Sequence, residues 1–232
     1  ALVVLGLGAL LMRRAPGEAA APPTADNPPS AGPVPGDFSL LQAARTGNFW
    51  LPFSVMFLLG LCVFSILTHI VPHVIDLGID PLTAASILSL IGGTSALGGL
   101  AAGRLSDSLG SRQTSVIFAL VTAGAMLWLT RATSLWMLYV FAVFFGFFYS
   151  GLLPSLAALL ADLFGLRHLG TLLGARNVAW AVGAAVGPAF TGYVFDLYGN
   201  YQAAFWGGLG AMLGIAVLVF FTRIPPTEGK PV

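Results

Sequence analysis

One arginine stands inside a long apolar run, and its chemistry is the easiest to specify. Arg176 lies seven residues, about 10 Å of helix, into the predicted segment 169–195. A guanidinium at that depth in a membrane is unfavourable unless it faces a cavity and meets an anion. Its fork of donors matches a carboxylate. The alternative is that the side chain extends to the nearby lipid headgroups.

Three other side chains are weaker candidates for contact with the same anion. Asn177 is the next residue, and Trp180 is one turn further, where its ring could stack on the guanidinium. A tryptophan in a membrane helix also serves for packing alone. Tyr149, in the predicted segment 135–160, is expected to face a cavity.

Two histidines stand four residues apart at one end of the first long apolar segment. His69 and His73 flank Pro72, and an imidazole there could accept a proton or hydrogen-bond a substrate. The alternative is a packed, hydrogen-bonded core residue for His69 and an interfacial position for His73. Zinc binding by the pair alone lacks a third ligand. We expect no metal and no cofactor.

Two glycine-containing segments have residue types that suit a conformational change. The stretch from Gly103 to Arg112 also holds Asp107 and Gly110. Its glycines would let the chain turn tightly between two helices, and the acid could pair with the arginine. The alternative is a plain helical hairpin. In the second segment, Gly187 and Pro188 form a predicted bending point, for which close helix packing is the alternative.

Composition places these residues in a membrane. Of 232 residues, 57% are hydrophobic and 8% charged, with mean hydropathy +0.89, which excludes an ordinary water-soluble globule. Net charge +1 provides no field for nucleic acid, so nucleic acid is excluded as a partner. The single cysteine, Cys62, cannot form a disulfide within the chain. Enzyme motifs are missing from the sequence, and we expect no enzyme.

The apolar runs predict an all-α membrane protein. Residues 1–12 resemble the end of a transmembrane helix that begins outside this sequence, and residues 13–47 form a Pro/Ala-rich linker ending in an interfacial helix. Residues 48–224 are predicted to form a six-helix transmembrane domain, and 225–232 a tail. The expected spans are 49–73, 83–103, 114–131, 135–160, 169–195 and 202–222.

The polarity of the spans and the positions of their charged residues predict how the spans lie in the membrane. The third and sixth are the least polar, so we expect them at the periphery and the other four along a cavity, as two three-helix inverted repeats. The end with Asp76, Asp80 and Asp196 has Arg131 as its only basic residue. The linker end, predicted to be cytoplasmic, carries Arg13, Arg14, Arg45, Arg104, Arg112, Arg167, Arg223 and Lys230.

The segment with Gly103, Asp107, Gly110 and Arg112 resembles the cytoplasmic-loop signature of the major facilitator superfamily, Gly-x3-Asp-x-x-Gly-x-Arg. It departs from that signature at Ser108 and Ser111, where basic residues are common. The resemblance implies a transporter of two six-helix halves, in which this loop holds the halves together in one state. This chain would be the second half, transmembrane helices 7–12 plus the end of helix 6, with the amino-terminal half missing.

Finer features resemble the monocarboxylate and oxalate/formate transporter group. They are Asn48-Phe-Trp, Thr68-His-Ile-Val-Pro-His73 with Asp76-Leu-Gly-Ile, and Leu90-Ile-Gly-Gly-Thr94. Gly170-Thr-Leu-Leu-Gly-Ala-Arg176 is similar to a stretch in which a lysine of oxalate transporters binds the dicarboxylate, which implies a carboxylate-binding role for Arg176. The Asp and Arg that animal monocarboxylate transporters carry before the loop are missing from 94–102. Their proton-symport mechanism therefore does not transfer.

The resemblance implies a multi-pass protein of the cell membrane that moves a small mono- or dicarboxylate by alternating access, with linker and carboxyl terminus cytoplasmic. The partners expected are the carboxylate, the lipid bilayer and the missing amino-terminal half. One alternative is an exporter of drugs or another solute in which Arg176 is structural. Another is a membrane sensor of the same fold that does not transport.

Overall fold

The structure is a computed structural model that describes residues 47–165 and 169–222. All of them lie in the second of the two units into which the chain divides, Gly36–Val232, and only this unit is described below. The expected helix end at 1–12, the linker and its interfacial helix at 13–46, and the tail at 225–232 lie outside the described residues.

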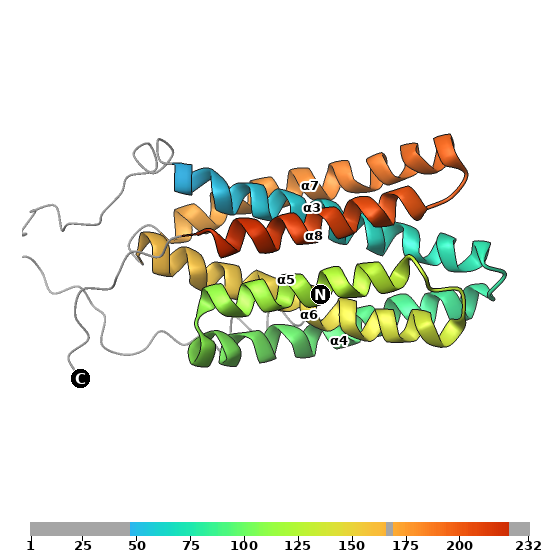
Figure 1. Cartoon of the computed structure of the whole chain (residues 1–232), viewed down its shortest axis with the longest axis horizontal. Coiled ribbons are helices and arrows are strands. Elements are labelled where there is room, and N and C mark those ends of the chain that lie inside the picture. The colour runs from blue at the N-terminus through green and yellow to red at the C-terminus, as the bar shows by residue number, and fades with distance from the viewer. Residues whose placement is uncertain (1–46, 166–168, 223–232) are drawn as a thin grey trace, which may run out of the picture. The chain divides into compact units, whose positions relative to one another are not determined.

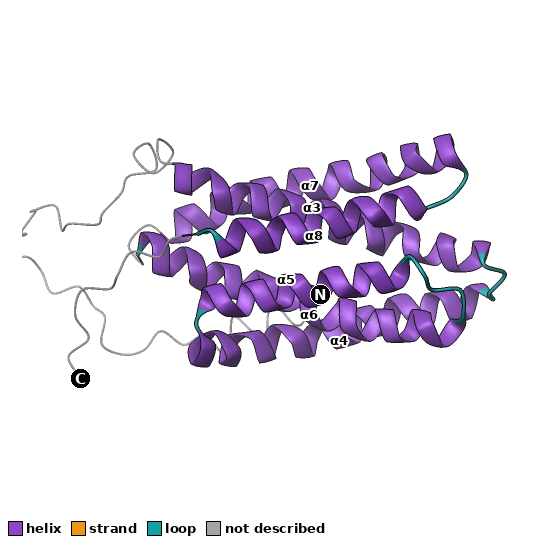
Figure 2. Ribbon diagram, viewed as in Figure 1, coloured by secondary structure: helices purple, strands orange, loops and turns teal. Residues whose placement is uncertain are grey.

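Six helices make up the described chain, and no strand occurs among its residues (Figures 1 and 2). Each is long and apolar enough to cross a membrane, as the six predicted spans require. The helices are α3 (Gly47–Asp76), α4 (Pro81–Leu109), α5 (Ser111–Leu129), α6 (Leu135–Phe164), α7 (Leu169–Tyr198) and α8 (Gln202–Phe220).

Helix lengths repeat with a period of three. Helices α3 and α4 have 30 and 29 residues and α5 has 19, and α6, α7 and α8 then have 30, 30 and 19. Successive helices alternate in direction, so α3 and α6 start at opposite ends of the bundle (Figure 1). The two triplets are therefore related as inverted repeats.

Polar caps and glycines set where the helices start and stop. At one end, called here the Asp80 end, the Asp80 carboxylate accepts hydrogen bonds from the backbone N–H groups of Leu82 and Thr83, which caps α4 ahead of Pro81. At the other end, called the Gly110 end, α4 stops and α5 starts at Gly110, whose φ is 90°. A side chain would be strained at that φ.

The helices pack in pairs that follow the same repeat. Helix α3 lies along α7, and α4 lies along α6. The two pairs are equivalent, because α3 corresponds to α6 and α7 corresponds to α4 in the two triplets. Glycines let both pairs approach closely, because a side chain at Gly183 of α7 would meet the backbone of Phe57, and one at Gly98 of α4 the backbone of Phe147.

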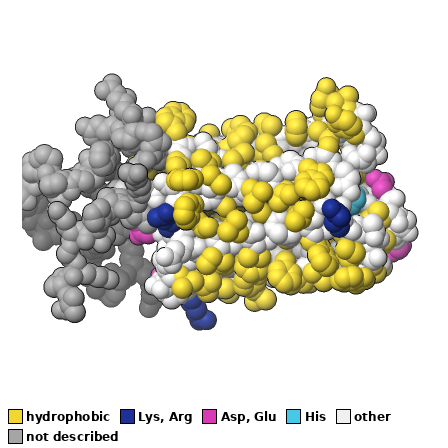
Figure 3. Space-filling view, viewed as in Figure 1, with side chains coloured by type: hydrophobic (Ala, Val, Ile, Leu, Met, Phe, Trp, Pro, Cys, Tyr) yellow, Lys and Arg dark blue, Asp and Glu magenta, His cyan; other side chains and the backbone are white. Residues whose placement is uncertain are grey.

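Helices α5 and α8 pack against each other. Most of their exposed large side chains are apolar, as a lipid-facing position requires: Ile117, Leu120, Leu127 and Trp128 on α5, and Trp206, Leu213, Val217 and Phe220 on α8. The exposed polar side chains of Gln113 and Gln202 lie in the first turn of each helix. The face in Figure 3 is mainly hydrophobic, with its visible charged side chains toward the two ends.

Gly98 and its neighbour Gly99 form a matched pair for testing the α4–α6 crossing. A Cβ at Gly98 would strike Phe147 of α6, whereas a Cβ at Gly99 has no atom within 4 Å. In the isolated 232-residue chain, Gly98→Val is expected to destabilise the fold by about 2 kcal/mol, or roughly 4–8 °C in thermal unfolding followed by size-exclusion chromatography. Gly99→Val should have little effect. Equal losses from both substitutions would contradict this packing.

Candidate functional site

Arg176 is buried between helices. It is 8% exposed, on the face of α7 that is buried against the bundle, and its Nη2 donates to the backbone carbonyl of Leu153 on α6 across 3.5 Å, the outer limit for such a bond. The Nε and Nη1 atoms are buried and have no hydrogen-bond partner within 47–165 and 169–222. Because these nitrogens are enclosed, the guanidinium does not extend to headgroups as the alternative prediction required.

No charged side chain of the described helices is positioned to neutralise Arg176. The guanidinium forms no ion pair with an acid of the described residues, and its one hydrogen bond there goes to the Leu153 carbonyl. The guanidinium therefore sits in the bundle with unused donors and without a protein anion among the described residues. An arrangement of this kind can bind a small anion, because a buried cation and its unpaired N–H groups would both be satisfied.

Tyr149, Asn177 and Trp180 lie near Arg176 along the chain but differ in what they face. Tyr149 is half-buried one turn from Leu153, and Ser95 of α4, the side chain near its hydroxyl, donates its own hydroxyl hydrogen to the Gly92 carbonyl. The Asn177 side chain is exposed. The Trp180 ring packs edge-on against Phe64 of α3, with centroids 5.7 Å apart. Among the described residues it does not stack on Arg176, so that part of the prediction is wrong.

His69 connects α3 to α7 at a distance from the arginine. Its Nε2 lies 3.1 Å from the carbonyl oxygen of Pro188. That oxygen only accepts, so Nε2 carries the proton and donates. Pro188 follows Arg176 by twelve residues, about 18 Å of helix. A small carboxylate bound at Arg176 therefore does not reach His69 in this conformation.

Gly187, beside Pro188, is a point of close helix contact. A side chain at this position would meet the Leu61 carbonyl and the Ser65 hydroxyl of α3. The close packing weighed against a bending role is therefore present. A bend at Pro188 stays a prediction.

His73 belongs to an aromatic cluster at the Asp80 end. Its ring packs edge-on against Tyr201 and Phe205, with centroids 5.7 and 4.9 Å away, and its buried Nε2 has no hydrogen-bond partner in the described part of the chain. Tyr201, in the link before α8, is 6% exposed. Burial, with the charges of Asp76 and Asp196, raises the pKa of Tyr201, so its hydroxyl stays neutral.

The signature-like segment is more helical than predicted. Gly103 and Asp107 lie inside α4, both exposed, and the chain turns at Gly110 alone. The expected tight turn is therefore right at Gly110 and wrong at Gly103. Helix α4 continues six residues past the predicted end at 103, because polar residues beyond a hydrocarbon layer can remain helical.

Arg112 contacts α8 instead of Asp107. Its Nη2 donates to the Phe220 carbonyl, and its guanidinium carbon lies 5.2 Å from the centre of the Phe220 ring. No ion pair with Asp107 forms in the described part, so the predicted pairing is wrong. Beside it, the Ser111 hydroxyl donates to the Asp162 carboxylate of α6. Both contacts tie the start of α5 to the ends of other helices.

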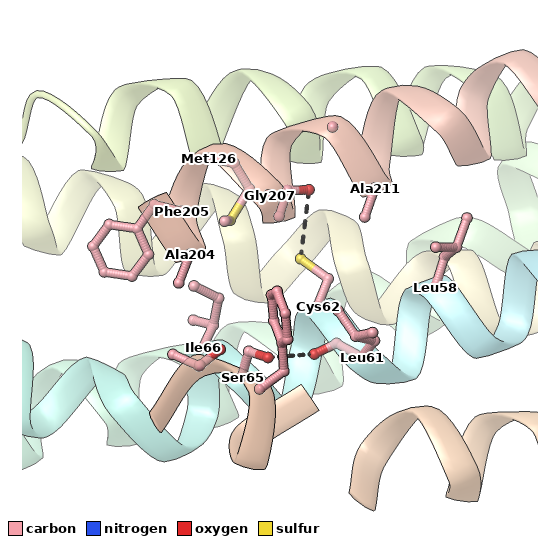
Figure 4. A pocket seen from close by; sticks show the side chains of 14 residues that line it. Leu58, Leu61, Cys62, Ser65, Ile66, Met126, Ala204, Phe205, Gly207 and Ala211 are labelled. Atoms are coloured by element: carbon pink, nitrogen blue, oxygen red, sulfur yellow. Dashed lines mark hydrogen bonds between the residues drawn. The ribbon is translucent and has the colours of Figure 1, made fainter. Parts of the chain in front are cut away.

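A separate crevice lies among α3, α7 and α8. Its volume is about 320 Å³, and Figure 4 shows mainly apolar side chains around Cys62. The Cys62 thiol is 3.8 Å from the Gly208 carbonyl, and the Ser65 hydroxyl donates to the Leu61 carbonyl. Because no charged side chain lines it, this crevice has no group that would pair with an anion.

Sequence relatives of the chain are membrane transporters. The sequence model of the Major Facilitator Superfamily matches residues 1–123 and 70–232. Monocarboxylate transporter 13 of Bos taurus is 30% identical over 222 residues, 89% of this chain and 49% of that protein. The MFS transporter asaE of Aspergillus flavus is 29% identical over 213 residues, 89% of this chain and 47% of that protein. The chain spans about half the length of these relatives.

A solved structure has the same fold. The crystal structure of the Major Facilitator Superfamily transporter FucP, in the outward conformation, superposes with a TM-score of 0.67. The match covers 95% of this chain and 51% of that chain, at 18% sequence identity. At this identity the likeness concerns the fold alone.

The turn at the Gly110 end predicts opposite effects of one substitution at two glycines. Gly103→Ala is expected to stabilise the fold by about 0.5 kcal/mol, because glycine is unfavourable inside a helix. Gly110→Ala should destabilise it by about 1–3 kcal/mol, because φ is 90° there. Thermal unfolding of the purified variants measures both, and a stabilising Gly110→Ala would contradict the turn.

The unused donors of Arg176 predict that this residue lowers stability. Arg176→Met should raise the free energy of unfolding by about 1–2 kcal/mol, because it removes buried, unpaired N–H groups. Arg104→Met, at an exposed position, serves as the control and should change little. A lower unfolding temperature for Arg176→Met alone would mean that the guanidinium has a stabilising partner.

Proposed function

This chain belongs to the major facilitator superfamily, and from that premise we propose that it is the carboxyl-terminal half of a secondary active transporter. The proposed cargo is a small organic anion, a mono- or dicarboxylate, moved across the membrane by alternating access. Similarity to proteins named monocarboxylate transporters supports this class of cargo. The carboxylate and an amino-terminal half of the same transporter are the proposed partners.

The observation that carries the proposal is the buried, incompletely paired guanidinium of Arg176. Among the described residues, two of its nitrogens lack partners and no acid pairs with it. Leaving such a cation permanently unpaired is unfavourable, so a mobile anion is the species that would complete it. A carboxylate fits best because it can accept two parallel N–H bonds from one guanidinium.

Tyr149, Asn177 and Trp180 are proposed to complete the site around Arg176. Tyr149 is one turn from the carbonyl that Arg176 contacts, and Asn177 and Trp180 lie within one turn of the arginine on α7. A hydroxyl and an amide would orient the second end of a carboxylate substrate, and the indole would limit its size. His69 is proposed as a second contact on the route, separate from the one at Arg176.

The conformational change is proposed to use two other parts of the fold. The segment with Gly103, Asp107, Gly110 and Arg112 would hold the two halves together in one state, with exposed Asp107 available to the other half. Gly187 and Pro188 would be the point at which α7 bends. In this proposal the Gly110 end is cytoplasmic, which agrees with Arg104 and Arg112. The other six basic residues used for orientation lie outside the described residues.

Uptake by the full-length protein in proteoliposomes tests the proposal. With a panel of radiolabelled mono- and dicarboxylates, Arg176→Met is expected to lower uptake of the transported anion about 100-fold, because a charge-assisted pair of hydrogen bonds is lost. Arg176→Lys should retain part of the activity, since it keeps the charge but not the fork. Arg131→Met, in the exposed link at the opposite end of the bundle, is the control and should transport normally.

Three outcomes would favour the alternatives. Unchanged carboxylate uptake by Arg176→Met, at equal protein in the membrane, would make the arginine structural. Transport of an uncharged solute or a drug but of no carboxylate would indicate the exporter. Failure to move any member of a broad panel, with ligand binding retained, would indicate a sensor.

A further inference from the structure

An apolar groove runs between α5 and α6 on the outside of the bundle, at the Asp80 end. It is about 390 Å³ in volume, and its lining is free of charge. Phe141 and Ala125 form a buried floor, and exposed Phe144 and Trp128 form its rim. Gly124 borders open space in this groove, because a Cβ at that position would meet no atom within 4 Å.

Two tryptophans stand where the groove reaches the helix ends. Trp128 lines it, and the Trp136 ring packs edge-on against the Trp128 ring at 5.8 Å. The Trp128 indole N–H donates to the Met137 carbonyl, which fixes the ring. Tryptophan pairs with one apolar face and one polar atom are typical of the level of lipid headgroups.

An arginine without a side-chain partner among the described residues follows Trp128 by three residues. Arg131 is exposed in the link between α5 and α6, and its backbone N–H donates to the Trp128 carbonyl. Its guanidinium makes no hydrogen bond or ion pair with any described residue, although Asp76, Asp80 and Asp196 lie at the same end of the bundle. It is the only Lys or Arg among the described residues of that end.

We propose that this groove binds one phospholipid, with an acyl chain along Gly124 and the phosphate at Arg131. Charge complementarity selects the occupant, because an apolar channel that ends at a tryptophan pair and an unpaired cation matches a hydrocarbon chain that ends at an anion. The volume falls at the lower end of the roughly 300–1,000 Å³ that holds small ligands. The site is about 10 Å long, from Val121 to Trp128.

Photolabelling of the full-length protein in nanodiscs tests this site. The probe is phosphatidylglycerol with a diazirine in one acyl chain, added to phosphatidylcholine, and labelled peptides are mapped by mass spectrometry. Label is expected to concentrate on residues 121–144, above the level on lipid-facing α8. Gly124→Leu should lower it about tenfold by filling the groove. Arg131→Gln should lower it about fivefold, and Arg131→Lys should restore it.

The controls separate a specific site from general lipid contact. Gly210→Leu on α8 also meets no atom within 4 Å and should leave the label on α5 and α6 unchanged. A long-chain alcohol with the same diazirine tests the phosphate, because its labelling should not respond to Arg131→Gln. Because Arg131 is in an exposed link, its variants are expected to fold, and they test the site even if Gly124→Leu unfolds the protein. Equal labelling of α5 and α8, labelling insensitive to both sites, or a second protein crosslinked in the groove would overturn the proposal.

Discussion

Close contact between helix backbones is the constraint on which this fold depends. Lipid chains are as apolar as leucine, so burial from water does not hold membrane helices together, and van der Waals packing must do so. The backbone of α7 reaches α3 at Gly183 and Gly187, and the backbone of α4 reaches α6 at Gly98. Because inverted repeats generate both crossings, one packing solution is used twice and fixes the positions of four helices.

Those crossings also explain how a charged residue can be held in the bundle. Arg176 lies on the same face of α7 as the buried glycines, so the contact that brings α7 against its neighbours also encloses the guanidinium. The enclosure supplies one long hydrogen bond, to the Leu153 carbonyl, and leaves other donors unused. At Arg176 the unused donors lower the stability of the fold, and the same donors are held ready to bind an anion.

Hydropathy predicted the six spans, because a run of apolar side chains marks the part of a helix that lies in hydrocarbon. It misplaced the end of α4, since Ser106 and Asp107 are polar but remain helical beyond that layer. The sequence also singled out Arg176, whose charge is conspicuous in an apolar segment. It could not reveal the partners, because Arg176, His69 and Arg112 all contact backbone carbonyls, which every residue carries. Such contacts depend on tertiary placement alone.

The short third helix of each triplet has a consequence for the membrane around the protein. At 19 residues, α5 and α8 are each about 29 Å long, close to the hydrocarbon thickness of a bilayer, whereas helices of 30 residues reach about 45 Å. The long helices can tilt or project into water, but the short pair has no surplus length. Thickening of the bilayer would therefore act first on α5 and α8, and hydrophobic mismatch at this pair would set which membranes suit the protein.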